Sequence, residues 1–285
     1  MTTKGIAVNF VKMQATGNDF ILVDAQSLER DWPALAVEMC RRHFGAGADG
    51  LLLVLPSEAA GLRLRMFNPD GSEAEACGNG LRCFARYAQD NGLVSGDEFT
   101  VETMAGIRTV RTRAEKGIRV TMGIPAFAPD AIPIIVERGN EADAAAVIDC
   151  AISVGDRELE ISAVSMGNPH AVCFLEQPVS DFPLAEVGPL VEHNRIFPGR
   201  VNFEVANITG INEVRARVWE RGAGETLSCG SGACAIAVSA IVRGLSRSPV
   251  DIILPGGTLT VDWDGAGEVL LSGPAETVFK GEWAD

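Results

Sequence analysis

Two stretches of the sequence share one pattern: E-A-E-A-C-G-N-G at residues 73–80 and E-T-L-S-C-G-S-G at residues 225–232. Both fit Glu-x-x-x-Cys-Gly-x-Gly, and this aligns Cys77 with Cys229. Each copy follows a glycine-containing turn and precedes a segment with the pattern of a helix that stops at a glycine. A motif that returns with the same neighbours indicates two related halves.

The residue types in each copy favour an anion site. Glycines let the backbone turn tightly and bring N–H groups close to a ligand. A helix that begins just after the cysteine adds unsatisfied N–H groups and the positive end of its dipole. This arrangement binds an anion and is expected to favour thiolate over thiol. One such motif alone is more typical of a buried structural cysteine, but two matching copies favour a functional role.

Two cysteines at helix ends suit one reaction in particular. One thiolate removes a proton from a carbon acid, and the other thiol delivers a proton to the opposite face. The helix ends stabilise the charge that develops on the neighbouring carboxylate. The motif pair therefore predicts a two-base racemase or epimerase.

The rest of the chain reads mainly as short strands separated by turns, with few helices. Helices are predicted from the Asp31 cap towards His43, at 78–91, at 231–243 and, bent or interrupted by Gly188-Pro189, at 183–193. The predicted strands are 7–14, 20–24, 51–55, 62–68, 99–103, 108–113, 118–122, 132–136, 161–165, 171–175, 201–208, 214–219, 252–254, 259–263 and 269–271. This pattern favours strand-rich layers.

Charge and composition exclude several partners. The formal net charge is -14, so neither a nucleic acid nor an anionic membrane surface is expected to bind. The longest mostly apolar stretch, 233–242, is far shorter than the roughly 20 residues that span a bilayer. No export signal is recognisable, and seven cysteines are an odd number without a CxxC motif. We therefore expect a cytoplasmic protein with reduced cysteines.

Cofactor chemistry has little support in the sequence. The four lysines do not adjoin a phosphate-binding glycine cluster, which argues against pyridoxal phosphate. Nucleotide-binding glycine motifs are missing from strand-to-helix contexts. The Cys77–Cys83 and Cys229–Cys234 spacings differ from those of close zinc-ligand pairs. We expect no cofactor and no metal, and a redox or zinc protein remains an alternative.

Several longer motifs resemble the diaminopimelate epimerase family over the whole chain. They are K-M-Q-A-T-G-N-D-F-I-L-V-D at 12–24, R-H-F-G-A-G-A-D-G at 42–50, F-N-P-D-G-S-E-A-E-A-C-G-N-G-L-R-C-F-A-R-Y at 67–87, S-M-G-N-P-H-A-V at 165–172, V-N-F at 201–203 and W-E-R-G-A-G-E-T-L-S-C-G-S-G-A-C-A at 219–235. The resemblance implies an α+β fold of two pseudo-symmetric halves, each a strand-rich sheet or barrel around a central helix. It places Cys77 in residues 1–126 plus 273–285 and Cys229 in residues 127–272, with the active site in the cleft between them.

The resemblance also implies roles for individual residues. Cys77 and Cys229 would be the acid/base pair acting on diaminopimelate in a homodimer. His170 and Glu220 would tune the thiols. The substrate-binding residues would be Asn18, Asn68, Gly78, Asn79, Asn168, Asn202, Glu220, Arg221, Gly230 and Ser231. Where many family members have a substrate-contacting Gln, this chain has Gly50.

Each of these binding residues also has a structural interpretation. Asn18 and Asn68 could shape turns, His170 could be a buried structural histidine, and Arg221 could pair with a surface carboxylate. Other functions also stay open. A racemase of another amino acid, such as proline, would share the chemistry but need a smaller and more apolar distal pocket. A non-catalytic carboxylate-binding protein would not need two thiols.

Overall fold

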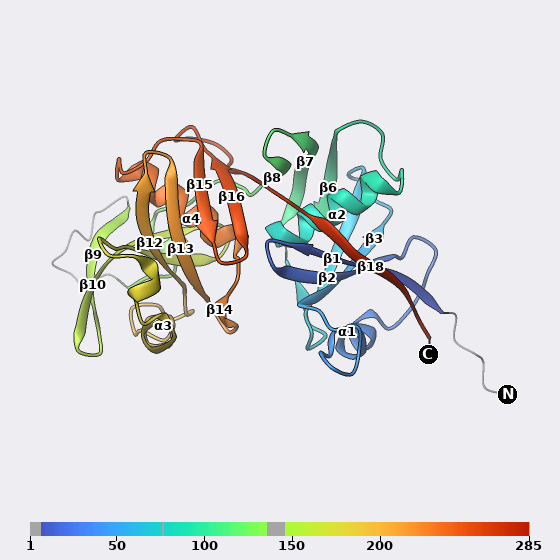
Figure 1. Cartoon of the computed structure of the whole chain (residues 1–285), viewed down its shortest axis with the longest axis horizontal. Coiled ribbons are helices and arrows are strands. Elements are labelled where there is room, and N and C mark those ends of the chain that lie inside the picture. The colour runs from blue at the N-terminus through green and yellow to red at the C-terminus, as the bar shows by residue number, and fades with distance from the viewer. Residues whose placement is uncertain (1–6, 76, 136–145, 285) are drawn as a thin grey trace. The chain divides into compact units, whose positions relative to one another are not determined.

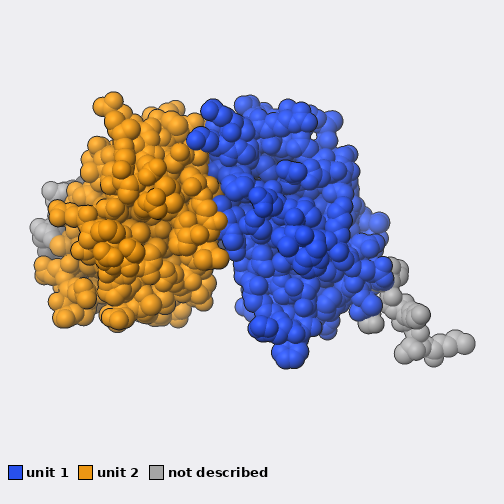
Figure 2. Space-filling model, in the orientation of Figure 1, with its two compact units in different colours: residues 1–120, 272–285 blue, residues 121–271 orange. Residues whose placement is uncertain are grey.

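The computed structural model describes residues 7–75, 77–135 and 146–284. The chain divides into two compact units, Met1–Val120 with Ser272–Asp285 and Thr121–Leu271 (Figure 2). The boundaries predicted from the sequence lie a few residues further along the chain.

The first unit is a strand-rich layer with two helices (Figure 1). Its helices are α1 (Trp32–Cys40) and α2 (Gly78–Asp90). Its strands are β1 (Val8–Ala15), β2 (Asn18–Asp24), β3 (Gly50–Leu55), β4 (Leu62–Phe67), β5 (Glu73–Ala74), β6 (Glu98–Thr103), β7 (Gly106–Ala114), β8 (Gly117–Thr121), which ends in the first residue of the second unit, and β18 (Glu276–Trp283).

The second unit has the same kind of composition. Its α-helices are α3 (Leu184–Glu192) and α4 (Gly230–Val242), and short 3-10 turns cover Pro129–Ala131 and Val179–Asp181. Its strands are β9 (Val147–Val154), β10 (Arg157–Ser165), β11 (Pro169–Phe174), β12 (Asn202–Gly210), β13 (Glu213–Glu220), β14 (Gly224–Thr226), β15 (Val250–Leu254), β16 (Gly257–Asp262) and β17 (Leu270–Gly273), which ends in the first unit.

The two units repeat one topology. In the first, β1 and β2 are antiparallel, β3 returns parallel to β2 after α1, and β4 and β5 follow antiparallel before α2. In the second, β10 and β11 are antiparallel, β12 returns parallel to β11 after α3, and β13 and β14 precede α4. The strand after each motif helix runs parallel to the fourth strand of the set: β6 to β4 and β15 to β13. The two-halved, strand-rich fold expected from the repeated motif is confirmed.

Each motif helix packs at the centre of its own unit. α4 contacts β10, β11, β12, β15 and β16, and the run from Gly232 to Ala240 is buried on all sides. A helix that is apolar all round is stable only when it is enclosed. α2 contacts β1, β2, β3, β4 and β7, and it buries Leu81, Cys83 and Phe84. Its Arg82 is also fully buried, where it donates hydrogen bonds to Gly78 and Asn79.

Several local predictions differ from the structure, and the sequence pattern did not indicate β5, β14 or β18. The strand predicted at 132–136 is absent over residues 132–135, where Ile132 and Ile134 instead close a turn onto the Pro129 carbonyl; residue 136 lies outside the described residues. β9 was not predicted, because Asp149 and Ser153 interrupt its apolar residues without a regular alternation. α3 continues past Gly188-Pro189 without interruption. Pro189 is the sixth residue of α3, so it removes one N–H donor from the helix interior without ending the helix.

Candidate active site

Cys77 is the N-cap residue of α2. Its backbone is extended, with φ -134° and ψ 124°, and its carbonyl oxygen accepts the first helical hydrogen bond from Leu81. The Sγ atom lies 3.7 Å from Oδ1 of Asn18, and Nδ2 of Asn79 lies 3.3 Å from the same oxygen. The first unit therefore brings three of the predicted site residues, Cys77, Asn18 and Asn79, together at a helix N-terminus.

Asp49 fixes the orientation of Asn18. Its Oδ2 accepts a 2.7 Å hydrogen bond from Nδ2 of Asn18, which turns the amide oxygen of Asn18 towards Cys77. Asp49 in turn is bound at 2.7 Å by Arg42, which also binds Asp19. Sequence reasoning did not identify Asp49, although it stands beside Gly50 in one of the family motifs.

Asp19 anchors this cluster from the next position on β2. Burial raises its pKa, but the Arg42 and Lys12 side chains outweigh burial and hold the pKa at about 2. Nζ of Lys12 lies 2.5 Å from Oδ2 of Asp19 and also donates to the Gly47 carbonyl. The Asp19 carboxylate therefore stays ionised across the neutral range and holds Arg42 beside Asp49, the partner of the Asn18 amide.

Cys229 is the N-cap residue of α4, in the place that Cys77 has in α2. Its Sγ accepts a hydrogen bond from the Gly232 backbone N–H at 3.4 Å, and Oγ of Ser231 lies 3.5 Å from the sulfur. The thiol also donates to the carboxylate of Glu220, the last residue of β13. Thr226 donates a 2.5 Å hydrogen bond to the same carboxylate.

The expected preference for thiolate is wrong at Cys229. Burial and the neighbouring Glu220 charge raise the pKa of the Cys229 thiol well above its usual value. The hydrogen bonds from Ser231 and Gly232 lower the pKa, but they do not overcome burial. Burial also raises the pKa of Glu220, since Thr226 and Cys229 compensate only in part. At neutral pH the Cys229 side chain therefore holds its proton.

His170 lies behind this half-site on β11 and has no exposed surface. Nδ1 is 2.7 Å from Oε1 of Glu204, and Nε2 is 3.0 Å from Oδ1 of Asn168. Asn168 also reaches Ser231, with Nδ2 at 3.4 Å from Oγ. The structure therefore connects His170 to the start of α4 through Asn168. Glu204 is a second residue that sequence reasoning missed, although it directly follows the V-N-F motif.

The remaining predicted residues have mainly structural contacts. Asn202 is buried, donates to the Pro169 carbonyl and accepts from the Arg221 backbone N–H, so its amide ties two chain segments together. The Arg221 side chain is exposed and donates to the Gly199 carbonyl at 3.1 Å. Asn68 bonds to Ser72 within the turn before β5. The structure does not bring Asn68 to Cys77 by any hydrogen bond that it shows.

Gly50 begins β3 with its backbone packed against neighbouring groups. A Cβ atom added there would lie 3.0 Å from the Phe67 carbonyl oxygen and 3.4 Å from the Phe20 ring. A longer side chain at this position would therefore need the surrounding strands to shift. The polar group that this edge of the sheet presents is Asp49 instead.

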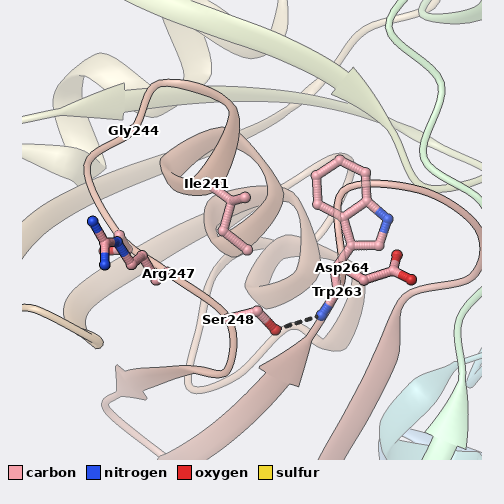
Figure 3. A pocket seen from close by; sticks show the side chains of 7 residues that line it. Ile241, Gly244, Arg247, Ser248, Trp263 and Asp264 are labelled. Carbon is pink, nitrogen blue, oxygen red and sulfur yellow. Dashed lines mark hydrogen bonds between the residues drawn. The ribbon is translucent and has the colours of Figure 1, made fainter.

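A separate pocket of about 440 Å³ lies at the other end of α4. Ile241, Gly244, Ser246, Arg247, Ser248, Trp263 and Asp264 line it, and Ser248 accepts a hydrogen bond from the Trp263 backbone (Figure 3). About 13 residues of helix, roughly 20 Å at 1.5 Å each, separate it from Cys229. Within the described parts of the chain, no group of three or more His, Cys, Asp or Glu could hold a metal ion. No helix of those parts is long and apolar enough to cross a membrane.

Solved structures with the same fold define the class of protein. A hydroxyproline epimerase from Agrobacterium vitis, with bound trans-4-hydroxy-L-proline, matches with a TM-score of 0.69 at 15% identity, over 98% of this chain and 92% of that chain. A PhzF-family phenazine biosynthesis protein from Bacillus anthracis matches with a TM-score of 0.66 at 19% identity, over 98% of this chain and 99% of that chain. The fold is thus one that epimerases share with PhzF-family proteins.

Sequence comparison identifies the family within this class. The family model for diaminopimelate epimerase matches residues 10–128 and 162–278. Proteins named diaminopimelate epimerase from Moorella thermoacetica and Desulfovibrio desulfuricans are 47% and 44% identical, covering 97% and 98% of this chain and 99% of each relative. The chain belongs to the diaminopimelate epimerase family, and it is an isomerase.

Proposed function

We propose that this chain interconverts LL- and meso-2,6-diaminopimelate without a cofactor, using Cys77 and Cys229 as the acid/base pair. Family membership supports the substrate. The observation that carries the mechanism is that two cysteines hold the same position, the N-cap of a central helix, in two units of one topology. A protein that only bound carboxylates would not need a thiol at either helix end.

The overall reaction breaks one C–H bond at the α-carbon and forms a new C–H bond on its opposite face. A thiolate takes the hydrogen from the α-carbon, so that an S–H bond forms as the C–H bond breaks. The other thiol then donates its hydrogen to the opposite face of that carbon and becomes a thiolate. The backbone N–H groups at Gly78, Asn79, Gly230 and Ser231 bind the adjacent carboxylate, on which negative charge grows during proton removal.

The surroundings of Cys229 suit the donor role. Glu220 accepts the thiol hydrogen, and burial opposes ionisation, so this side chain holds a proton ready for delivery. In the reverse direction Cys229 must act as the base. The hydrogen bonds from Ser231 and Gly232 would then stabilise the thiolate.

Arg221 is assigned to the distal carboxylate of the substrate. The helix N-termini bind the reacting carboxylate, so Arg221 is available for the distal one. A guanidinium binds a carboxylate through two parallel hydrogen bonds. Within the described residues, the contact of the Arg221 guanidinium is to a carbonyl and not to a carboxylate. Asn18 and Asn168 would contact the polar groups of the substrate near each thiol, and Asn68 would do so further out. Asn202 would act by holding the Arg221 backbone.

We also propose a cytoplasmic homodimer. The β18 strand supports the dimer: it pairs with β1, and its Val278 and Phe279 are exposed. Exposed apolar edge strands readily pair with another chain. Val278→Asp should convert the dimer to a monomer in sedimentation experiments, whereas Ile211→Asp, an exposed position in the second unit, should leave the dimer intact. A wild-type monomer, or a dimer that survives Val278→Asp, would contradict this assignment.

The substrate assignment is tested by incubating the purified chain with LL-diaminopimelate, without added cofactor and with a metal chelator. We expect meso-diaminopimelate to accumulate to equilibrium, as followed by chiral chromatography. L-Proline under the same conditions should not racemise. Racemisation of proline with no reaction of diaminopimelate would support the racemase alternative and reject this assignment.

A further inference from the structure

Glu204, on β12, is a fully buried acidic residue that the mechanism above does not use. Its Oε1 lies 2.7 Å from Nδ1 of His170, and neither side chain has exposed surface. Within the described parts of the chain, no hydrogen-bond partner reaches its second oxygen, Oε2. A buried oxygen without a hydrogen-bond partner destabilises the folded state. If Glu204 only filled the core, an apolar side chain of similar size would therefore give a more stable protein.

Glu204 also lies close to the start of α4. A Cβ atom added to Gly232 would be 3.0 Å from Oε1 of Glu204 and 3.4 Å from Sγ of Cys229. The carboxyl group and the thiol therefore approach the same glycine. A side chain at residue 232 would disturb both groups.

Four contacts connect Glu204 to the Cys229 sulfur through side chains. The distances are 2.7 Å from Glu204 to His170, 3.0 Å from His170 to Asn168, 3.4 Å from Asn168 to Ser231 and 3.5 Å from Ser231 to Cys229. We call these five residues the Glu204 chain. Its members come from β12, β11, the turn before β11 and the N-terminus of α4.

Counting the hydrogens that each group can donate shows which atom is the donor at every contact of the Glu204 chain. We call this order of donors the direction of the chain. The Glu204–His170 contact contains one hydrogen, held either by the carboxyl group or by Nδ1. Nε2 of His170 must carry a hydrogen, because it faces the amide oxygen of Asn168 and an amide oxygen can only accept. The Asn168 amide then points its N–H towards Ser231, whose oxygen accepts it. The Ser231 hydroxyl hydrogen is left to point at Sγ of Cys229.

We propose that Glu204 is a positioning residue that sets this direction, so that the Ser231 hydroxyl donates to Cys229 whenever Cys229 becomes a thiolate. If Glu204 were absent, Nδ1 of His170 would have no partner, and the ring could carry its hydrogen on Nδ1 instead of Nε2. Asn168 would then lose the hydrogen bond that fixes the orientation of its amide. The inference rests on the acid/base role proposed for Cys229. It assigns no contact between Glu204 and substrate.

One test determines which ring nitrogen of His170 carries the hydrogen in the wild-type protein, without measuring activity. The sequence has only three histidines, so the ring nitrogens of His170 can be assigned by nitrogen-15 NMR with His43→Gln and His193→Gln as assignment variants. We expect Nε2 of His170 to be protonated. A His170 ring whose Nε2 carries no hydrogen would overturn the proposal, whatever the activity of the enzyme.

A second test is a double-mutant cycle. Glu204→Met keeps the length of the side chain and removes its polar atoms, and Ser231→Ala removes the last hydroxyl but keeps the helix N–H groups. We expect each variant to lower kcat at least about tenfold with KM little changed, which marks a loss confined to the transition state. The double variant should be no slower than the slower single variant, because both break the same chain. Glu160→Gln, an exposed carboxylate bound to Arg243, is the control and should keep the wild-type kcat.

The outcomes separate this proposal from the assigned function. Unchanged kcat in Glu204→Met, or multiplied losses in the double variant, would overturn the Glu204 proposal while leaving the epimerase assignment intact. If Glu204→Met does not fold, the nitrogen-15 NMR measurement of His170 in the wild-type protein still tests the Glu204 proposal. A wild-type chain that fails to act on diaminopimelate would reject the function, whereas the NMR result would stand by itself.

Discussion

At the scale of single residues, the protonation of Cys229 depends on a balance between burial, the carboxylates of Glu220 and Glu204, and two hydrogen bonds. Glu220→Gln removes the negative charge that raises the pKa of the thiol. We expect Cys229 to react faster with iodoacetamide at pH 8 in this variant, because a lower pKa leaves more of the thiol as thiolate. Peptide mass mapping measures the rate, with the part-buried Cys150 as the internal control. Equal Cys229 rates in the two proteins would show that Glu220 does not influence the thiol.

Arg221 is the second residue whose side chain should decide activity. Arg221→Lys keeps the charge but loses the two parallel hydrogen bonds, so KM for diaminopimelate should rise strongly and kcat should fall with it. If Arg221 is only a surface residue, the change should cost at most about 1 kcal/mol of stability and leave the kinetics unaltered. The matched control is Arg243→Lys, in the same unit, where Asp149 and Glu160 bind the guanidinium. Wild-type kinetics in Arg221→Lys would remove this residue from the site.

At the scale of elements, α3 supports the strand that ends in Glu220. A Cβ atom on Gly188 of α3 would lie 2.6 Å from the Trp219 ring, and that ring also donates a hydrogen bond to Glu192. Gly→Ala usually stabilises a helix by about 1 kcal/mol, but overpacking typically costs 1–3 kcal/mol. We therefore expect Gly188→Ala to lower the free energy of unfolding, by up to about 2 kcal/mol, in urea titrations.

The control for this prediction is Gly199→Ala. An added Cβ at Gly199 has no neighbour within 4 Å, so its stability should change little. A Gly188→Ala variant as stable as Gly199→Ala would show that α3 and Trp219 can separate at no cost. The close packing of α3 on β13 would then not be what holds Glu220 in place.

The elements also show what sequence reasoning could and could not supply. Helices with clear end signals were predicted well: α1 begins after the Asp31 cap, α2 begins after Cys77, and α4 begins after Cys229. The β9 and β18 strands were missed because their apolar and polar residues do not alternate regularly in the sequence. The predicted strand at 132–136 failed because apolar residues there pack a turn into the core rather than a sheet. Local apolar runs do not distinguish these two cases.

At the scale of the whole molecule, the repeated motif was the decisive signal. It indicated two related halves, and the structure repeats one order of strands and helices on each side of the division. The half-sites could be predicted only in part. Cysteines and helix ends are visible in the sequence, but Asp49 behind Asn18 and Glu204 behind His170 depend on contacts between residues about thirty positions apart. No spacing rule connects such residues before the chain is folded.

In the proposed mechanism, two thiols, one in each unit, act on opposite faces of one carbon. The most direct measurement is the reaction of LL-diaminopimelate in deuterium oxide, stopped early and analysed by NMR and mass spectrometry. Two bases predict deuterium at the inverted α-carbon of the meso product and almost none in the recovered LL substrate, because the delivered hydrogen comes from the second thiol. Cys77→Ala and Cys229→Ala should each reduce this conversion by about 10²–10⁴-fold. A meso product that retains the substrate hydrogen, or an alanine variant with near-normal conversion, would rule out the two-thiol mechanism.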